Sequence, residues 1–201
     1  MRGHKTGITL IELLVVLGIV ALLATLLATF QGDVFYFNRI IEKHLTAQTD
    51  TRRALERMIS ELRTAAPSEE GGYPIAAADA SNITFFSDTD DDGYRERIRY
   101  FLDESTLIRG MIPPTGSPAT YLQANEKKEV LADFVRTDVA PLFTYYTEQY
   151  PKIADALEEP IILSSIRLIR ISITIDEERA KLPSALILQS SVQLRNLKDN
   201  L

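Results

Sequence analysis

The chain carries the sequence GITLIELLVVLGIVALLATLLATF at residues 7–30. From Ile8 to Phe30 this stretch holds one charged residue, Glu12, in an otherwise uncharged and mainly apolar run. At about 1.5 Å rise per residue, a helix over residues 8–30 is about 34 Å long, enough to cross a hydrocarbon core of about 30 Å. The stretch therefore predicts a membrane-spanning helix, around which the rest of the chain is organised.

Residues 1–7 form a short basic segment ahead of the apolar run. They include Arg2, His4 and Lys5 and no acidic residue. Because cytoplasmic flanks of membrane helices carry an excess of Lys and Arg, the N-terminus is predicted to be cytoplasmic. The predicted topology is a single pass through the inner (cytoplasmic) membrane, with a periplasmic or otherwise extracytoplasmic C-terminal domain.

The junction at Gly7 differs from an ordinary secretory signal, in which a small-residue cleavage site follows the apolar region. Here the small residue precedes the apolar run, so a cut after it leaves the helix attached. The sequence Gly-Ile-Thr-Leu-Ile-Glu-Leu-Leu-Val, residues 7–15, resembles the class III leader junction of type IV prepilins and type II secretion pseudopilins. The resemblance implies cleavage after Gly7 by prepilin peptidase and methylation of the new amine at Ile8, which stands where phenylalanine is usual.

Glu12 is the informative residue of the apolar run. A carboxylate inside a membrane segment costs about 2.5 to 3.5 kcal/mol even on insertion scales, so such a residue usually has a partner. Cleavage after Gly7 would create a positive amine at Ile8, and opposite charges attract strongly in a medium of low dielectric constant. Glu12 is therefore predicted to guide assembly by pairing with the amine of a neighbouring subunit.

The helical pattern continues beyond Phe30. Gln31-Gly32-Asp33 could kink the helix but contains no proline, and the pattern is predicted to stop before Pro67. A helix over residues 8–66 would be about 88 Å long, which is natural for a filament subunit. The predicted pairs Arg52–Glu56 and Arg57–Glu61 lie on the solvent side. Apolar residues recur at intervals of three and four at Val34, Phe37, Ile41, Leu45, Leu55, Met58 and Leu62.

The remainder of the chain predicts a small exported domain built on strands. Residues 67–82 form a loop, and strands follow at 83–87, 97–102, 106–112 and 142–147. The strict alternation of residues 169–175 places isoleucines on one core face, and residues 186–194 are in phase as the last strand, after a loop over 176–183. Two long strands with one solvated face predict an antiparallel sheet, covered by the apolar stripe of the helix.

The predicted fold class is α+β, of the type IV pilin-like kind, with a long N-terminal helix packed on an antiparallel sheet. The predicted segments are a leader at 1–7, a transmembrane and filament-core helix at 8–30, its amphipathic continuation at 31–66 and an exported α+β domain at 67–201.

Composition excludes several classes of function. The net charge is −6, and removing Arg2 and Lys5 with the leader makes it −8, so no nucleic-acid partner is expected. The absence of cysteine excludes disulfides and thiolate chemistry, and His44 is the only histidine outside the leader. The sequence has no Gly-x-Ser-x-Gly, His-Glu-x-x-His or phosphate-binding glycine loop. No catalytic residue and no enzymatic activity are predicted.

The acidic turn is the one constellation with metal-ligand spacing. Asp88, Asp90 and Asp92 alternate before Gly93, as in the first half of a calcium loop, and Glu96 falls at the ninth position. The closing position, where a bidentate glutamate belongs, is occupied by arginine 99, and arginines 95 and 97 also follow at once. These arginines are predicted to neutralise the aspartates in a metal-free turn. No cofactor is expected, and calcium stays the alternative.

The order of elements is similar to minor pseudopilins of the J kind and W-type minor pilins. This resemblance implies a low-copy structural subunit near the tip of a type II secretion pseudopilus, helping to initiate filament assembly for protein secretion. The implied partners are prepilin peptidase, other minor subunits, the major subunit, the inner-membrane assembly platform and the membrane. Contacts to other subunits are predicted on the helix at Phe35, Ile40 and Ile59.

Two alternatives remain open. A minor pilin of a type IV pilus, acting in assembly, adhesion or DNA uptake, would share the leader and differ in the exposed domain. An adhesin draws support from aromatic residues at Tyr145, Tyr146 and Tyr150. A membrane-anchored periplasmic enzyme is the more distant alternative.

Processing should remove residues 1–7 and expose Ile8 at the N-terminus. Intact-mass measurement of the membrane-purified protein checks this expectation, because methylation adds a defined mass to the same product. Gly7→Trp should block the cut, while Gly18→Ala, a change of the same residue type inside the apolar run, should leave it unaffected. A mature N-terminus anywhere after Phe30 would contradict the expected processing.

Overall fold

The computed structural model describes residues 9–152, 155–175 and 186–194, with side chains omitted at 26, 29, 32–45 and 47. Two compact units make up the chain, unit 1 at Met1–Leu45 and unit 2 at Thr46–Leu201. The predicted leader at 1–7 and the predicted loop over 176–183 therefore lie outside the described residues.

One long helix, α1, spans Leu10–Arg63. It confirms the prediction of a single N-terminal helix, and it continues through Gln31, Gly32 and Asp33 without interruption. The helix ends shortly before Pro67, whose ring is incompatible with a helix interior. The hydroxyl of Thr64 donates to the carbonyl of Glu61 and so satisfies one of the terminal acceptors.

The first sheet of unit 2 is an antiparallel meander in the order β1-β2-β3-β4-β5. The three predicted strands at its centre are confirmed as β2, β3 and β4, whereas β1 and β5 were missed. Both are edge strands, and β5 is exposed over most of its length, so no alternation of burial marks its sequence. The strands are β1 Ile75–Ala78, β2 Asn82–Ser87, β3 Glu96–Asp103, β4 Thr106–Ile112 and β5 Lys127–Ala132.

A second antiparallel sheet is built around β8, which pairs with β6, β7 and β9. The prediction of one sheet was therefore wrong. Hydrophobic periodicity locates strands but does not say which strands share hydrogen bonds. Phe134, with a φ of 60°, lies between β5 and β6, where the chain leaves one sheet for the other. The strands are β6 Val135–Arg136, β7 Phe143–Tyr146, β8 Leu168–Ile175 and β9 Leu186–Gln193.

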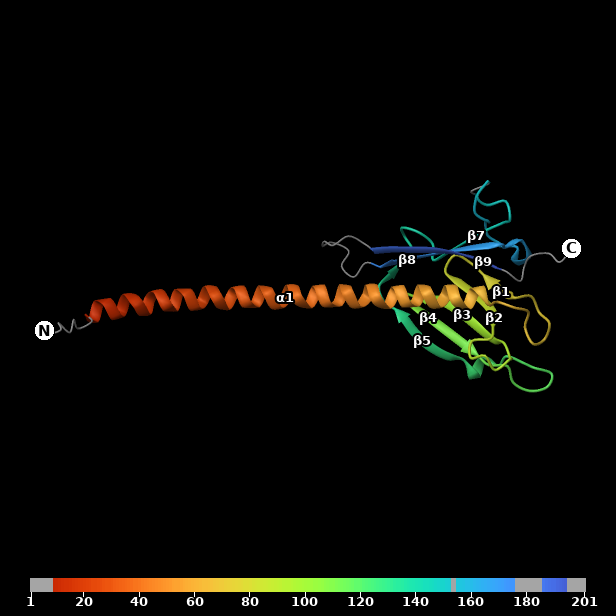
Figure 1. Ribbon diagram of the computed structural model, residues 1–201, viewed down its shortest axis with the longest axis horizontal. Coiled ribbons are helices and arrows are strands. Elements are labelled where there is room, and N and C mark those ends of the chain that lie inside the picture. The colour runs from red at the N-terminus through yellow and green to blue at the C-terminus, as the bar shows by residue number, and fades with distance from the viewer. Residues whose placement is uncertain (1–8, 153–154, 176–185, 195–201) are drawn as a thin grey trace, which may run out of the picture. The chain divides into compact units, whose positions relative to one another are not determined.

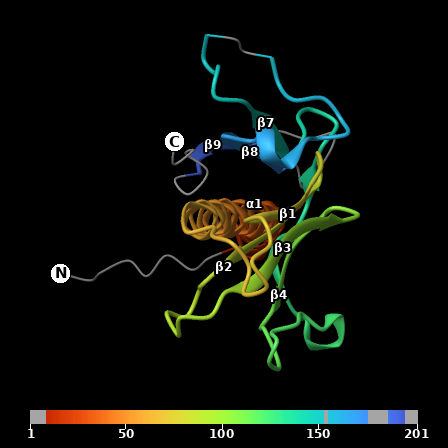
Figure 2. The same cartoon turned by 90° about the vertical axis from the view of Figure 1, so that its right-hand side faces the viewer.

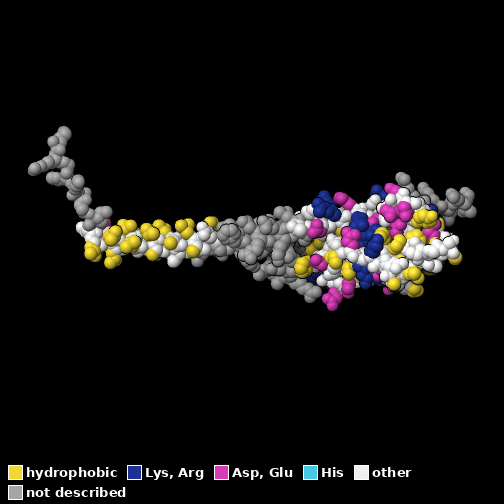
Figure 3. All heavy atoms as spheres, turned by 90° about the horizontal axis from the view of Figure 1, so that it is seen from below, with side chains coloured by type: hydrophobic (Ala, Val, Ile, Leu, Met, Phe, Trp, Pro, Cys, Tyr) yellow, Lys and Arg dark blue, Asp and Glu magenta, His cyan; other side chains and the backbone are white. Residues whose placement is uncertain are grey.

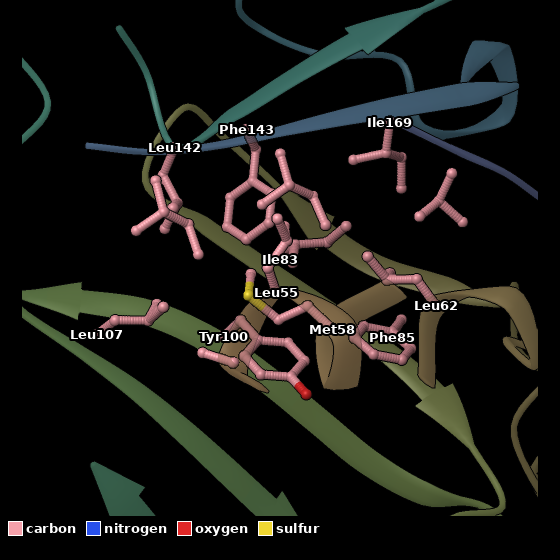
Figure 4. Packing of buried hydrophobic residues seen from close by; sticks show 14 of the residues in the cluster. Leu55, Met58, Leu62, Ile83, Phe85, Tyr100, Leu107, Leu142, Phe143 and Ile169 are labelled. Atoms are coloured by element: carbon pink, nitrogen blue, oxygen red, sulfur yellow. The ribbon is translucent and has the colours of Figure 1, made fainter. Parts of the chain in front are cut away.

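Within unit 2, the C-terminal part of α1 lies between the two sheets (Figures 1 and 2). Leu55, Met58 and Leu62 are buried there, as the apolar spacing predicts. The earlier members of the predicted stripe, at 34–45, have side chains outside the described residues. Figure 4 shows the helix residues packed among side chains from both sheets, and beside Leu142, which precedes β7. The labelled sheet residues are Ile83, Phe85, Tyr100, Leu107, Phe143 and Ile169.

The long strand β8 is buried on both faces over its second half. All four predicted core isoleucines are buried, at 169, 171, 173 and 175. Ser172 and Thr174, which alternate with them and were predicted to be solvated, are buried as well. The prediction of one solvated face was wrong for this strand. The alternation of apolar and polar residues does not show whether other parts of the chain pack on the polar face.

Glu61 joins α1 to the first sheet through a buried ionic cluster. Both carboxylate oxygens accept hydrogen bonds from Nε of Arg109 at 3.1 Å, and Oε2 also accepts the Tyr100 hydroxyl at 2.7 Å. Arg57 donates to Glu61 at 3.0 Å and to Glu129 on β5 at 2.8 Å. Burial, together with the neighbouring Glu61 carboxylate, raises the pKa of the Tyr100 phenol.

The predicted Arg57–Glu61 pair is thus confirmed, but Glu61 is buried and does not lie on the solvent side. Its carboxylate tolerates burial because three donors satisfy it. The other predicted pair, Arg52–Glu56, is absent from the ion pairs of the described residues.

Glu61→Ala should destabilise unit 2 by about 3 to 5 kcal/mol, because it leaves the guanidinium of Arg109 buried without its counter-ion. The midpoint of thermal unfolding, followed by near-UV circular dichroism of the tyrosines in detergent, should fall by about 6 °C or more. The control is Glu56→Ala, an exposed acid on the same helix, with an expected effect of about 0.5 kcal/mol or less. Equal effects of the two substitutions would show that the cluster contributes nothing specific.

Candidate functional site

The first turn of α1 is closed by Thr9. Its Oγ1 accepts a hydrogen bond from the backbone N–H of Glu12 at 3.3 Å, and its carbonyl accepts the N–H of Leu13 at 3.1 Å. Thr9 is therefore the N-cap, and Glu12 occupies the third helical position, the spacing of a capping box. This local role was not predicted, although Thr-x-x-Glu ahead of an apolar run is the sequence signature of a capping box.

The position of Glu12 has an electrostatic consequence. The carboxylate is exposed in the first helical turn, where the partial positive charge of the helix N-terminus favours an anion. The predicted cleavage residues Gly7 and Ile8 lie outside the described residues. Glu12 therefore lies at the start of the helix. It is four residues from Ile8, where cleavage after Gly7 would leave a positive amine.

The start of α1 presents a large apolar surface. Leu10 is 81% exposed and Phe30 66%, and the large apolar residues described between them are all more than half exposed. Figure 3 shows hydrophobic side chains covering this described part of unit 1. A helix that is apolar around its whole circumference is typically buried among other apolar groups.

Within the described residues, no helix combines the length and apolarity needed to cross a membrane. The predicted span of residues 8–30 therefore stays a prediction.

The acidic turn between β2 and β3 gathers three of the four predicted metal ligands. Oxygen atoms of Asp88, Asp90 and Glu96 all lie within 4.8 Å of one another, whereas Asp92 is not part of this group. Instead Asp92 accepts the N–H of Tyr94 at 2.8 Å. Glu96 is 3% exposed and accepts two hydrogen bonds from Thr89.

The arginines that follow the turn do not neutralise these carboxylates, so that expectation was wrong. Arg95 forms an ion pair with Glu69 at 3.0 Å, and Arg99 forms one with Glu126 at 2.9 Å. Arg97 donates to the side-chain oxygen of Gln123. All three partners are more than twenty residues away in the sequence, so sequence proximity was misleading. The turn consequently keeps its negative charge.

The carboxylates fit a calcium ion only in part. One oxygen of Asp88 is buried without a hydrogen-bond partner, which a cation could satisfy. Calcium takes six to eight oxygen ligands, however, and this group supplies three carboxylates. Arg99, at the closing position, is committed to Glu126 and offers no oxygen. The arrangement supports weak binding at most.

The tyrosines that supported the adhesin hypothesis are mostly buried in the core. Tyr145 is 1% exposed, and its hydroxyl donates to the carbonyl of Asp79 at 2.9 Å. Tyr146 is 4% exposed, and only Tyr150 is half-buried, with its hydroxyl accepting from Arg170. These tyrosines do not form an exposed binding platform.

Of the predicted subunit contacts, only Ile59 falls on a described side chain, since those of Phe35 and Ile40 lie outside the described residues. Ile59 is half-buried and lines a groove of about 900 Å³ between the end of α1 and β9. The other lining residues are Glu56, Ser60, Arg63, Thr64, Ser191 and Gln193.

Comparison with known proteins identifies the N-terminal segment. Residues 2–28 match the family model of the prokaryotic N-terminal methylation motif. The matched span contains Gly7, Ile8 and Glu12. No curated protein matches the chain.

Calcium should bind the acidic turn no more tightly than about 0.1 mM, because the ligand set is incomplete. Burial raises the pKa of Glu96, so protons compete with calcium and the affinity should fall as the pH is lowered. Titration calorimetry of the full chain in detergent measures both effects, with Glu96→Gln as the ligand variant and exposed Glu148→Gln as the control. A micromolar dissociation constant that Glu96→Gln abolishes would contradict the expectation.

Proposed function

We propose that this chain, a type IV pilin-like protein by its N-terminal methylation motif, is a minor pseudopilin: a low-copy structural subunit near the tip of a type II secretion pseudopilus. In this role it is stored in the inner membrane, processed by prepilin peptidase and assembled through its N-terminal helix. It helps to initiate the filament and catalyses no reaction. The match of residues 2–28 to the methylation motif is the observation that carries the proposal.

The described start of α1 supports assembly through this segment. Exposed apolar side chains from Leu10 to Phe30 need lipid before assembly and other helices after it. Because apolar surface is satisfied equally by lipid and by neighbouring helices, the apolar residues alone do not fix the position of a subunit in a filament.

Glu12 supplies a position-specific electrostatic attraction, which the apolar residues lack. Its carboxylate stands in the first turn behind the Thr9 cap. An amine at Ile8 of an incoming or preceding subunit would neutralise it, and the attraction is strong where water is excluded. A subunit then docks at the one position where both charges are paired.

Unit 2 supports a structural role for the exported part of the chain. Its core is formed by α1 and both sheets, and the buried charge of Glu61 is used to join α1 to β3 and β4. The sequence contains none of the hydrolase or phosphate-binding motifs named above.

The same leader would serve a minor pilin of a type IV pilus. The two systems differ in the partners of the subunit. In a pseudopilus these are other pseudopilins and a secretion platform, and in a type IV pilus they are pilus subunits. Cross-linking of the chain to co-expressed subunits of each kind separates these alternatives.

Glu12→Ala and the isosteric Glu12→Gln should leave the protein in the membrane fraction and remove it from filaments. The translocon tolerates either residue, but both variants lose the charge that pairs with the Ile8 amine. Site-specific cross-linking to the major subunit in membranes should fall about tenfold or more, and Glu12→Asp should recover part of it. The control Leu14→Ala removes apolar area and keeps the charge. Normal assembly of Glu12→Gln would show that charge pairing is not required.

A further inference from the structure

Three loops of unit 2 meet around the Tyr121 hydroxyl. They span residues 67–74, 88–95 and 113–123, and they are called here the loop platform. The Tyr121 hydroxyl donates to the carbonyl of Arg95 at 2.9 Å and accepts the N–H of Glu69 at 3.2 Å. Glu69 in turn accepts both the backbone N–H and the side chain of Arg95. Each loop is thus bonded to the other two.

Each loop is also held by bonds of its own. In the first, Ser68 and Gly72 are joined by two hydrogen bonds, through the backbone and through the serine hydroxyl. In the third, Thr115 and Thr120 exchange two backbone hydrogen bonds at 2.8 Å. The Tyr121 ring packs on Phe86 of β2, with ring centroids 5.1 Å apart. A partner would therefore meet a surface that is already ordered.

The loop platform exposes apolar side chains that its own bonds do not use. Tyr94 is 59% exposed, Leu122 54% and Tyr73 38%, one from each loop. Figure 3 shows hydrophobic and acidic side chains together at the end of unit 2 where these loops lie. Exposed aromatic residues on an ordered surface are typical of interaction sites.

The charge of the loop platform is strongly negative. Its sequence holds six carboxylates and one arginine, a formal charge of −5. The single arginine, Arg95, is committed to Glu69. The exposed carboxylates of Glu70, Asp90, Asp91 and Asp92 take part in none of the ion pairs of the described residues.

Calcium does not account for this charge, because only Asp90 of these four belongs to the cluster of oxygen atoms at the acidic turn. Symmetric pairing of two copies through this surface does not complement the charge either, since two such surfaces repel one another.

We infer that the loop platform binds a basic segment of a partner protein, with lysine or arginine side chains on the exposed tyrosines and among the carboxylates. Cations bind over aromatic faces with about 0.5 to 1 kcal/mol at exposed sites, and the aliphatic stems of lysine and arginine pack on apolar residues such as Leu122. The carboxylates attract the same side chains and orient the segment. The inference depends on unit 2 alone and does not require that the chain assemble into a filament.

A fluorescein-labelled hexa-arginine peptide tests the inference, with hexa-citrulline as its uncharged counterpart. Fluorescence anisotropy is measured with the full chain in dodecyl maltoside micelles, at about 0.1 M salt and with EDTA present. Hexa-arginine should bind, and hexa-citrulline should not. Absence of hexa-arginine binding, or equal binding of both peptides, would overturn the inference.

Charge variants distinguish binding at the loop platform from non-specific attraction of the peptide to an acidic protein. The triple variant Asp90→Asn, Asp91→Asn, Asp92→Asn should weaken binding about tenfold or more. The control Glu148→Gln, Asp155→Asn, Glu158→Gln removes the same charge from exposed positions elsewhere and should change binding less than about twofold. Equal losses in the two triple variants would show that binding is not localised to the platform.

The double variant Tyr73→Ala, Tyr94→Ala keeps the charge and should weaken binding about fivefold or more. Near-UV circular dichroism checks that unit 2 stays folded, which is expected because neither tyrosine belongs to the core cluster of the described residues. Unchanged affinity in this folded variant would overturn the role of the aromatic residues.

Discussion

The ionic cluster at Glu61 determines how unit 2 is held together. A buried carboxylate is costly unless donors satisfy it, and here Arg109, Tyr100 and Arg57 all donate to it. Apolar packing of Leu55, Met58 and Leu62 would tolerate small rotations of the helix, whereas the cluster specifies one register of α1 against β3 and β4. Side chains from both sheets pack around the helix in this register.

The two ends of α1 differ in character. Its described start is apolar and exposed, with Glu12 as the only charge, which suits lipid and other helices. From Thr51 onward it carries alternating buried and charged faces, which suits a folded core. The proposed function requires both properties, because a helix that leaves the membrane for a filament needs an apolar start, while the exported part has to stay folded.

The acidic turn shows how tertiary pairing changes the meaning of a motif. Three arginines follow the aspartates directly in the sequence, and the turn would be neutral if they folded back onto it. In the folded chain they instead pair with Glu69, Gln123 and Glu126, which lie in segments distant in the sequence. The aspartates therefore remain a source of negative charge on the surface, beside exposed tyrosines that only the folded loops bring together.

Local patterns of the sequence determined much of this protein. The junction at Gly7, the uncharged run to Phe30, the helical spacing and the alternation at 169–175 depend on residues close together in the chain, so they predicted the leader, the helix and the central strands. Tertiary structure alone decided the split into two sheets, the burial of Glu61, Ser172 and Thr174, and the pairing of the arginines. These features depend on contacts between residues far apart in the sequence, and neither periodicity nor composition records such contacts.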